Sequence, residues 1–163
     1  MQMWQLHNDP ELIGSLRELE GHVGLSVGFI LGCLQEDDWS MVIKMHALLE
    51  ASLSRIIVYA LGDDRLSDII TRVDFGDAKK GKVKIASTLG LIEKDEARFL
   101  RWFTELRNTL VHNVSNVNFN FKEYYEALAD REKDRIIKED VIDPDDPFVA
   151  QLHVVGEWGA LVE

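Results

Sequence analysis

The sequence predicts an all-α protein, and three observations support this prediction. Apolar residues recur at the three- and four-residue spacing of amphipathic helices along most of the 163 residues. No run alternates apolar and polar residues at the period of a half-buried strand. Typical helix start and stop residues, such as Pro10, Gly62 and Gly90, separate the periodic stretches. We therefore expect an up-and-down helical bundle formed by one domain over residues 1–142, followed by an extension over residues 143–163.

The N-terminal part is expected to contain one clear helix and one ambiguous stretch. Asp9 and Pro10 are a typical helix start, because Asp caps free backbone N–H groups and Pro is favoured in the first turn. Glycines at a spacing of four follow this helix, and two interpretations of them are open. They either line one face of a helix or belong to a loop that leads into a short buried segment. These residues are Gly24, Gly28 and Gly32.

The middle of the chain contains the strongest helical patterns. The longest predicted helix covers residues 39–61 and ends at Gly62, and its apolar residues lie on nearly all sides, so we expect it to be central and largely buried. A short amphipathic piece over 66–73 and a helix over 79–91 follow. A further helix over 95–112 has an apolar spine on one face. The spine consists of Phe99, Phe103, Leu106 and Leu110.

The C-terminal part is more polar. The asparagines between residues 113 and 120 are typical of turns. A charged helix with few apolar positions is expected from Lys122 to about Asp140, on the surface or against a partner. Residues 143–147 form a turn that contains Pro144 and Pro147, and the secondary structure of residues 148–163 stays open.

Composition and charge limit the functional classes. The chain is 46% apolar and 29% charged, as ordinary globular proteins are. The apolar run over 24–34 is shorter than the about 20 residues that span a bilayer, and no secretory leader is evident, so we expect a cytoplasmic protein without membrane contact. The single cysteine, Cys33, is expected to be an inert core thiol. The net charge of -11 opposes broad attraction to nucleic acid, so RNA binding would require a local basic patch.

One constellation carries most of the functional inference, namely Arg107, Asn108 and His112, here called the RNH motif. Arginine is permanently charged and binds phosphate oxygens through a fork of N–H groups. Histidine has an ordinary pKa of about 6.5 and can accept or donate a proton near neutrality. Together they supply what RNA cleavage by a 2′-hydroxyl group needs without a metal, and Asn108 could orient the phosphate or the imidazole. One copy lacks a second proton-transfer group, so we expect a homodimer that brings two copies together.

Helix geometry restricts how these side chains can meet. At about 100° per residue, His112 lies nearly opposite the apolar spine, and Arg107 and His112 are about 140° apart around the helix. Only a long arginine side chain or a fraying helix end lets both heads reach one point. A structural interpretation also stays open, because cations at a helix C-terminus complement the helix dipole and cap free carbonyl groups.

The RNH motif, near the end of a late helix, resembles the defining motif of the HEPN superfamily, in which Arg, a polar residue and, after a short gap, His occur together. The segment from Lys82 to Asn113 is more closely similar to the mannitol-operon repressor-like proteins, whose fold is HEPN-like. Asn118-Phe119 and the helix around His46 and Glu50 add to this likeness, which covers about half of the chain.

This resemblance implies an HEPN-like bundle that dimerises through the motif helix, with the charged C-terminal helix as an addition. It implies phosphate contact by Arg107, acid–base catalysis by His112 and support by Asn108. The corresponding activity is that of a metal-independent endoribonuclease of the toxin or defence type, with RNA as substrate and an antitoxin as protein partner. The repressor-like group implies instead a non-catalytic transcriptional regulator or protein-interaction domain.

Two further groups of residues are candidates around the RNH motif. Lysines at the front of the helix over 79–91 are candidate RNA-binding residues, or else an ordinary solvated helix face. They are Lys79, Lys80, Lys82 and Lys84. His46 and Glu50 lie one helical turn apart and either support the motif from a neighbouring helix or form a satisfied polar pair beside the core. Two potential ligands on one helix do not make a metal site, so we expect no metal and no cofactor.

Overall fold

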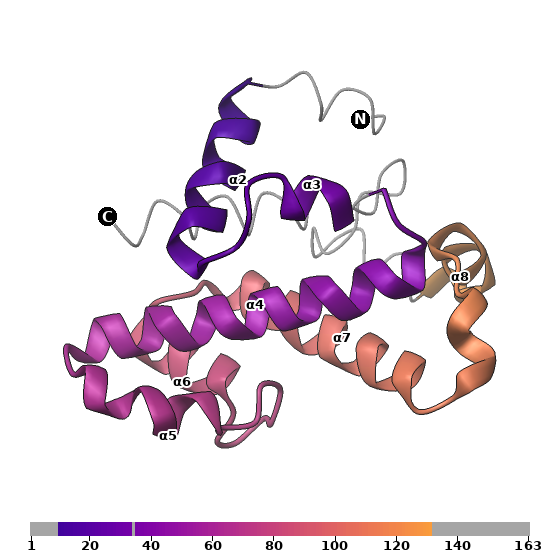
Figure 1. Ribbon diagram of the computed structural model, residues 1–163. Helices are drawn as coiled ribbons and strands as arrows, with labels where there is room; N and C mark the ends of the chain where they lie inside the picture. The colour runs from indigo at the N-terminus through magenta and orange to yellow at the C-terminus, as the bar shows by residue number, and fades with distance from the viewer. Residues whose placement is uncertain (1–9, 34, 132–163) are drawn as a thin grey trace.

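The computed structural model describes residues 10–33 and 35–131, and within these residues the chain is helical without a strand. The all-α prediction is therefore confirmed. The helix α4 lies in the middle of the bundle, with α2 and α3 on one side and α5, α6 and α7 on the other (Figure 1). The α-helices are α2 (Pro10–Val23), α3 (Phe29–Cys33), α4 (Asp38–Leu61), α5 (Ser67–Thr71), α6 (Lys82–Leu89), α7 (Lys94–Val111) and α8 (Phe121–Ala127).

The predicted central helix is confirmed as α4, which begins one residue earlier than expected. Asp37 caps its start by accepting a hydrogen bond from the Ser40 backbone N–H at 2.9 Å. Gly62 ends it in the left-handed conformation at φ 67°, where glycine avoids the strain that a Cβ atom would cause. Buried residues occur on several sides of the helix, so α4 forms the centre of the core. They include Met41, Val42, Met45, Leu49, Leu53 and Ile57.

The glycine-rich stretch follows the second of its two interpretations. Gly24 and Gly28 have φ values of 77° and 87°, so the chain forms a loop there before the short helix α3. The carboxylate of Glu20 is buried and accepts hydrogen bonds from the backbone N–H groups of Gly28, at 2.7 Å, and Ile30, at 2.8 Å. These bonds satisfy donors at the start of α3 that the short helix leaves free.

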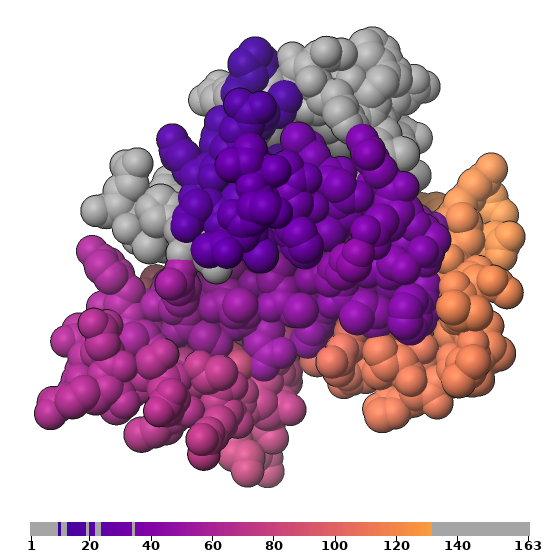
Figure 2. All heavy atoms as spheres, viewed as in Figure 1, coloured from indigo at the N-terminus to yellow at the C-terminus, as the bar shows by residue number. Residues whose placement is uncertain are grey.

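The α2–α3 segment closes one side of the core. Leu16, Ile30 and Cys33 are almost fully buried, which agrees with the predicted core position of the cysteine thiol. Burial raises the pKa of the Cys33 thiol, so it stays protonated and unreactive at neutral pH. In the space-filling view the side chains of this segment rest directly on α4 (Figure 2).

The segment between α4 and α6 is more irregular than predicted. The amphipathic piece expected over 66–73 is a 3₁₀ turn, Asp64–Leu66, followed by α5. The helix expected over 79–91 is α6, and it begins only at Lys82. The reason is a turn in which the Asp77 carboxylate accepts hydrogen bonds from the backbone N–H groups of Lys79 and Lys80, at 2.8 Å and 3.0 Å. Such local bonds compete with helix formation.

The motif helix is confirmed as α7. Glu93 and Glu96 form a reciprocal capping box at its start. All the residues of the predicted apolar spine are buried, and Phe99 and Phe103 stack with their ring centroids 5.6 Å apart. A 3₁₀ turn over Val114–Asn118 follows, in agreement with the turn predicted from the asparagines.

The predicted charged helix is interrupted near its start. Its first part is α8, which ends at Ala127, and Leu128 is extended before residues 130 and 131 are helical again. The remainder of that predicted helix, the turn over 143–147 and the extension over 143–163 lie outside the described residues, as does Asp9. No helix in the part of the chain that the structure describes is long and apolar enough to cross a membrane.

We expect Gly81→Ala to destabilise the fold by about 1–3 kcal/mol. A Cβ atom on Gly81 would lie 2.6 Å from both the backbone N and the backbone O of Asp77, and a backbone turn cannot yield as a flexible side chain does. Gly32→Ala in α3 is the matched control, because its Cβ would meet nothing within 4 Å. Urea unfolding followed by circular dichroism measures both variants, and equal stability of the two would contradict this account of the turn.

Candidate functional site

The RNH motif occupies the last turns of α7. Arg107 is partly buried, and its Nη1 donates a hydrogen bond to Asn108 Oδ1 at 2.9 Å. His112 is the C-cap residue of the helix and is exposed, and its backbone N–H donates to the Asn108 carbonyl at 3.2 Å. The structure therefore brings Arg107 and Asn108 into direct contact and leaves the His112 imidazole at the open end of the helix.

The free carbonyls at the end of α7 have partners outside the RNH motif. The Trp39 indole Nε1, 71 residues earlier in the chain, donates to the Leu110 carbonyl at 3.3 Å. The Asn116 side chain donates to the Thr109 carbonyl at 2.9 Å. No hydrogen bond from the Arg107 or His112 side chain to these carbonyls exists within the described residues. Capping by Trp39 was not found from the sequence, since a contact between distant segments leaves no spacing pattern. Asn116 lies in the adjoining turn, where the sequence predicted turn-forming asparagines but no bond to α7.

His46 lies in the interface between α4 and α7, and only 3% of it is exposed. Its ring packs edge-on against Phe75, with centroids 5.0 Å apart, and stacks on Phe103 at 6.3 Å. The Nε2 atom is buried and has no hydrogen-bond partner in the described structure. The sequence placed His46 in a helix beside the motif, and the charge of Arg107 does act on its imidazole.

Burial lowers the pKa of His46 to about 4, and the positive charges of Arg107 and Lys82 act in the same direction. The carboxylates of Glu50 and Asp74 oppose this shift only in part. His46 is therefore neutral at pH 7, and its imidazole adds no charge beside Arg107. A neutral imidazole can use one ring nitrogen as a hydrogen-bond acceptor.

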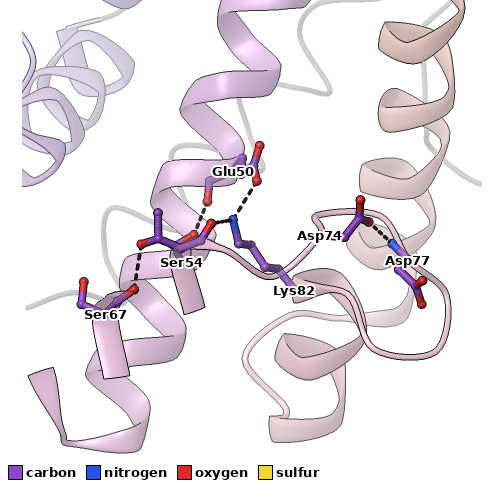
Figure 3. A network of polar contacts seen from close by, with 7 residues as sticks. Glu50, Ser54, Ser67, Asp74, Asp77 and Lys82 are labelled. Atoms are coloured by element: carbon purple, nitrogen blue, oxygen red, sulfur yellow. Dashed lines mark hydrogen bonds and ion pairs between the residues drawn. The ribbon is translucent and has the colours of Figure 1, made fainter. Parts of the chain in front are cut away.

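Glu50 pairs with Lys82 rather than with His46 (Figure 3). The Lys82 ammonium lies 2.7 Å from Glu50 Oε1 and 3.1 Å from the Thr71 carbonyl, and the lysine side chain is 1% exposed. The bond to Glu50 connects α6 to α4, and the bond to Thr71 connects α6 to the end of α5. The hydrogen-bonded pair of His46 and Glu50 that the sequence left as an alternative is therefore not formed.

The basic patch predicted from the sequence requires one correction. Lys79, Lys80 and Lys84 are exposed, whereas Lys82 is buried in its ion pair with Glu50 and is not available to a ligand at the surface. The physical reason is that α6 begins at Lys82 and turns this residue inward against α4. Gly76 packs against Thr104 of α7, since a Cβ atom there would lie 2.7 Å from Thr104 Cγ2. The loop that carries Lys79 and Lys80 therefore lies beside α7.

The end of α7 also presents apolar side chains to solvent. These are Val111, Val114 and Val117, exposed by 39%, 89% and 50%. They lie at the end of α7 and in the 3₁₀ turn that follows it, so this part of the surface is partly apolar. No group of three or more His, Cys, Asp or Glu residues placed to hold a metal ion occurs in the described part of the chain.

Comparisons of the chain with protein-family models, with curated proteins and with solved structures find no match.

We expect His46 to make the fold sensitive to acid. Its folded pKa of about 4 lies below its ordinary value of 6.5, so the unfolded chain binds more protons between these values. The free energy of unfolding should therefore fall as the pH drops from 6.5 to 4, by roughly 3 kcal/mol in total from this residue. Urea unfolding at several pH values measures the loss in the wild type and in His46→Phe, which has no imidazole to protonate. Parallel pH curves for the two proteins would rule out the effect.

We expect Glu50→Ala to cost more stability than the double substitution Glu50→Ala with Lys82→Met. The single change leaves the buried Lys82 ammonium with the Thr71 carbonyl as its remaining partner, and an uncompensated buried charge costs several kcal/mol. The methionine of the double variant removes that charge and keeps most of the volume. Denaturant unfolding of both variants and of Lys82→Met alone gives the coupling energy. If the changes in the free energy of unfolding of the two single variants add up to that of the double variant, the ion pair makes no measurable contribution to stability.

Proposed function

We propose that this chain is an HEPN-like domain that binds RNA at the C-terminal end of α7 and is a candidate metal-independent endoribonuclease of the toxin or defence type. The observation that carries the proposal is the arrangement of the RNH motif. Arg107 is partly buried and fixed by Asn108, and His112 is exposed at the end of the same helix. A fixed cation and an accessible imidazole are the groups that cleavage of a phosphodiester by a 2′-hydroxyl group requires.

In this proposal Arg107 neutralises the charge that develops on the phosphorane, and its fork of N–H groups binds the phosphate oxygens. His112 transfers a proton to or from the attacking or leaving oxygen. Asn108 holds the guanidinium in place through its 2.9 Å bond. The exposed Lys79 and Lys80 lie on a loop beside α7 and supply local attraction for RNA in a chain of net charge -11.

A homodimer would complete the site. Each chain offers one exposed imidazole at the end of α7, and acid–base catalysis needs both a proton donor and a proton acceptor. The exposed valines at positions 111, 114 and 117 give this end an apolar surface that a second copy would cover. Two copies joined there would place the His112 side chains of both chains near one composite site.

A second candidate function is a non-catalytic regulator or protein-interaction domain, like the mannitol-repressor-like proteins. The observation that favours it is the same apolar surface combined with the acidic net charge of -11, which suits a protein partner better than bulk RNA. In this case His112 and the valines contact the partner, and Arg107 only stabilises the end of α7.

RNA cleavage in the presence of EDTA tests the first candidate. We expect wild type to cleave single-stranded RNA, and Arg107→Ala and His112→Ala each to lose at least about 100-fold in rate, because each removes a group that acts in the transition state. Arg55→Ala is the matched control, since it removes an exposed arginine from α4. Circular dichroism and sedimentation confirm that all variants are folded and show their oligomeric state.

Mixing wild-type chains with an excess of His112→Ala chains tests the composite site. If the His112 imidazoles of both chains act at one site, each mixed dimer lacks one proton-transfer group and the activity falls below that of the wild-type chains alone. Independent sites would leave the activity of the wild-type chains unchanged. If the wild type binds RNA without cleaving it, an RNA-binding domain is the better interpretation. If the wild type neither binds nor cleaves RNA, the regulator is favoured.

A further inference from the structure

The buried nitrogen atoms that lack hydrogen-bond partners in the described structure include His46 Nε2 on α4 and Arg107 Nε on α7, besides Arg101 Nε earlier on α7. Buried polar atoms are almost always bonded in folded proteins, since an unbonded one reduces stability. His46 is enclosed by the rings of Phe75 and Phe103, where an apolar ring would pack without this penalty. The fold alone therefore gives no reason for a histidine at this position.

His46 Nε2 and Arg107 Nε are chemically complementary. Arginine Nε–H is a donor only, and a neutral imidazole offers one ring nitrogen as acceptor. His46 is neutral because burial lowers its pKa to about 4. Its ring stacks on Phe103, and Arg107 follows Phe103 by one helical turn on the same face of α7. The charged groups that act on the His46 pKa are Arg107 from α7, Glu50 from α4, Lys82 from α6 and Asp74 from the loop before α6. The Glu50 carboxylate is paired with the Lys82 ammonium. The Asp74 carboxylate accepts a hydrogen bond from the Asp77 backbone N–H.

Arg107 has to change its contacts when it binds a phosphate. In the free protein its Nη1 is bonded to Asn108 Oδ1. A phosphate bound by both terminal nitrogens would compete for this bond, and the guanidinium would then need another fixed partner. The neighbouring His46 can provide one from inside the protein, at a position that the RNA does not have to reach.

We propose that His46 is a positioning residue for Arg107, whose Nε–H donates a hydrogen bond to His46 Nε2 when its terminal nitrogens bind an RNA phosphate. This inference rests on the proposed function, because it assumes that Arg107 contacts RNA. It assigns His46 to the ligand-binding machinery within one chain and explains why an imidazole occupies an aromatic pocket of the core.

Substitutions at position 46 separate this role from a structural one. His46→Phe should unfold at an equal or higher temperature at pH 7, because it removes an unbonded buried nitrogen and fills the space between Phe75 and Phe103. The same variant should bind a short single-stranded RNA about tenfold more weakly, since a hydrogen bond to a charged group is lost. His46→Gln carries a side-chain oxygen that can accept the Nε–H bond, and it should retain most of the affinity. Fluorescence anisotropy at low salt measures the affinities.

Arg107→Ala identifies the path by which His46 acts. In an Arg107→Ala background, His46→Phe should cause no further loss of RNA affinity, and Arg55→Ala should bind like the wild type. The inference is overturned if His46→Phe binds RNA like the wild type, if His46→Gln is as weak as His46→Phe, or if the effects of His46→Phe and Arg107→Ala add. Wild-type RNA affinity in Arg107→Ala, or no RNA binding by the wild type, would overturn the proposed function together with this inference, and both outcomes are measured without any variant of His46.

Discussion

The burial of α4 on several sides is the constraint on which the rest of the structure depends. Each other layer of helices exists because it covers part of this apolar helix, α2 and α3 on one side and α5, α6 and α7 on the other. Polar residues on a helix of this kind cannot all reach solvent. Ser54 bonds the Glu50 carbonyl, and the Glu50 carboxylate pairs with Lys82, so these groups are satisfied within the protein. His46 Nε2 and Ser52 Oγ are buried without a hydrogen-bond partner in the described structure, and His46 is the one of the two that carries an aromatic ring packed on α7.

The end of α7 is held by one contact from a distant part of the chain and one from the turn that follows it. Trp39 at the start of α4 and Asn116 in the following 3₁₀ turn bond its last carbonyls. Asp38 of α4 in turn accepts a hydrogen bond from the Phe121 backbone N–H at the start of α8, at 2.8 Å. These bonds leave the side chains of the RNH motif free from the capping of α7. A cation and an imidazole that the fold does not use for capping are available for a ligand or a partner.

The net charge of the chain opposes RNA binding, whereas the side chains of the RNH motif favour it. The size of each effect decides how the two combine. A net charge of -11 repels RNA over distances comparable with the Debye length, about 10 Å at moderate ionic strength. In the proposed function, a fixed arginine and the exposed lysines of the loop beside α7 would determine the interaction with RNA at contact. A protein of this kind would bind RNA weakly and selectively rather than as a general polyanion, and its affinity would depend on how well Arg107 is positioned.

The sequence by itself determined the all-α class, the central helix, the motif helix with its buried spine, and the core position of Cys33, since these follow from local periodicity and from capping residues. It also identified Arg107, Asn108 and His112 as one group. Only the tertiary structure decided that Lys82 is buried, that Glu50 pairs with it, and that His46 packs between Phe75 and Phe103 without a hydrogen-bond partner at Nε2. It also decided that the glycine-rich stretch is a loop, held by the distant carboxylate of Glu20. The physical reason is common to these cases: helical periodicity records which face of a segment is buried, but the partner of a buried polar group comes from another segment and leaves no local pattern.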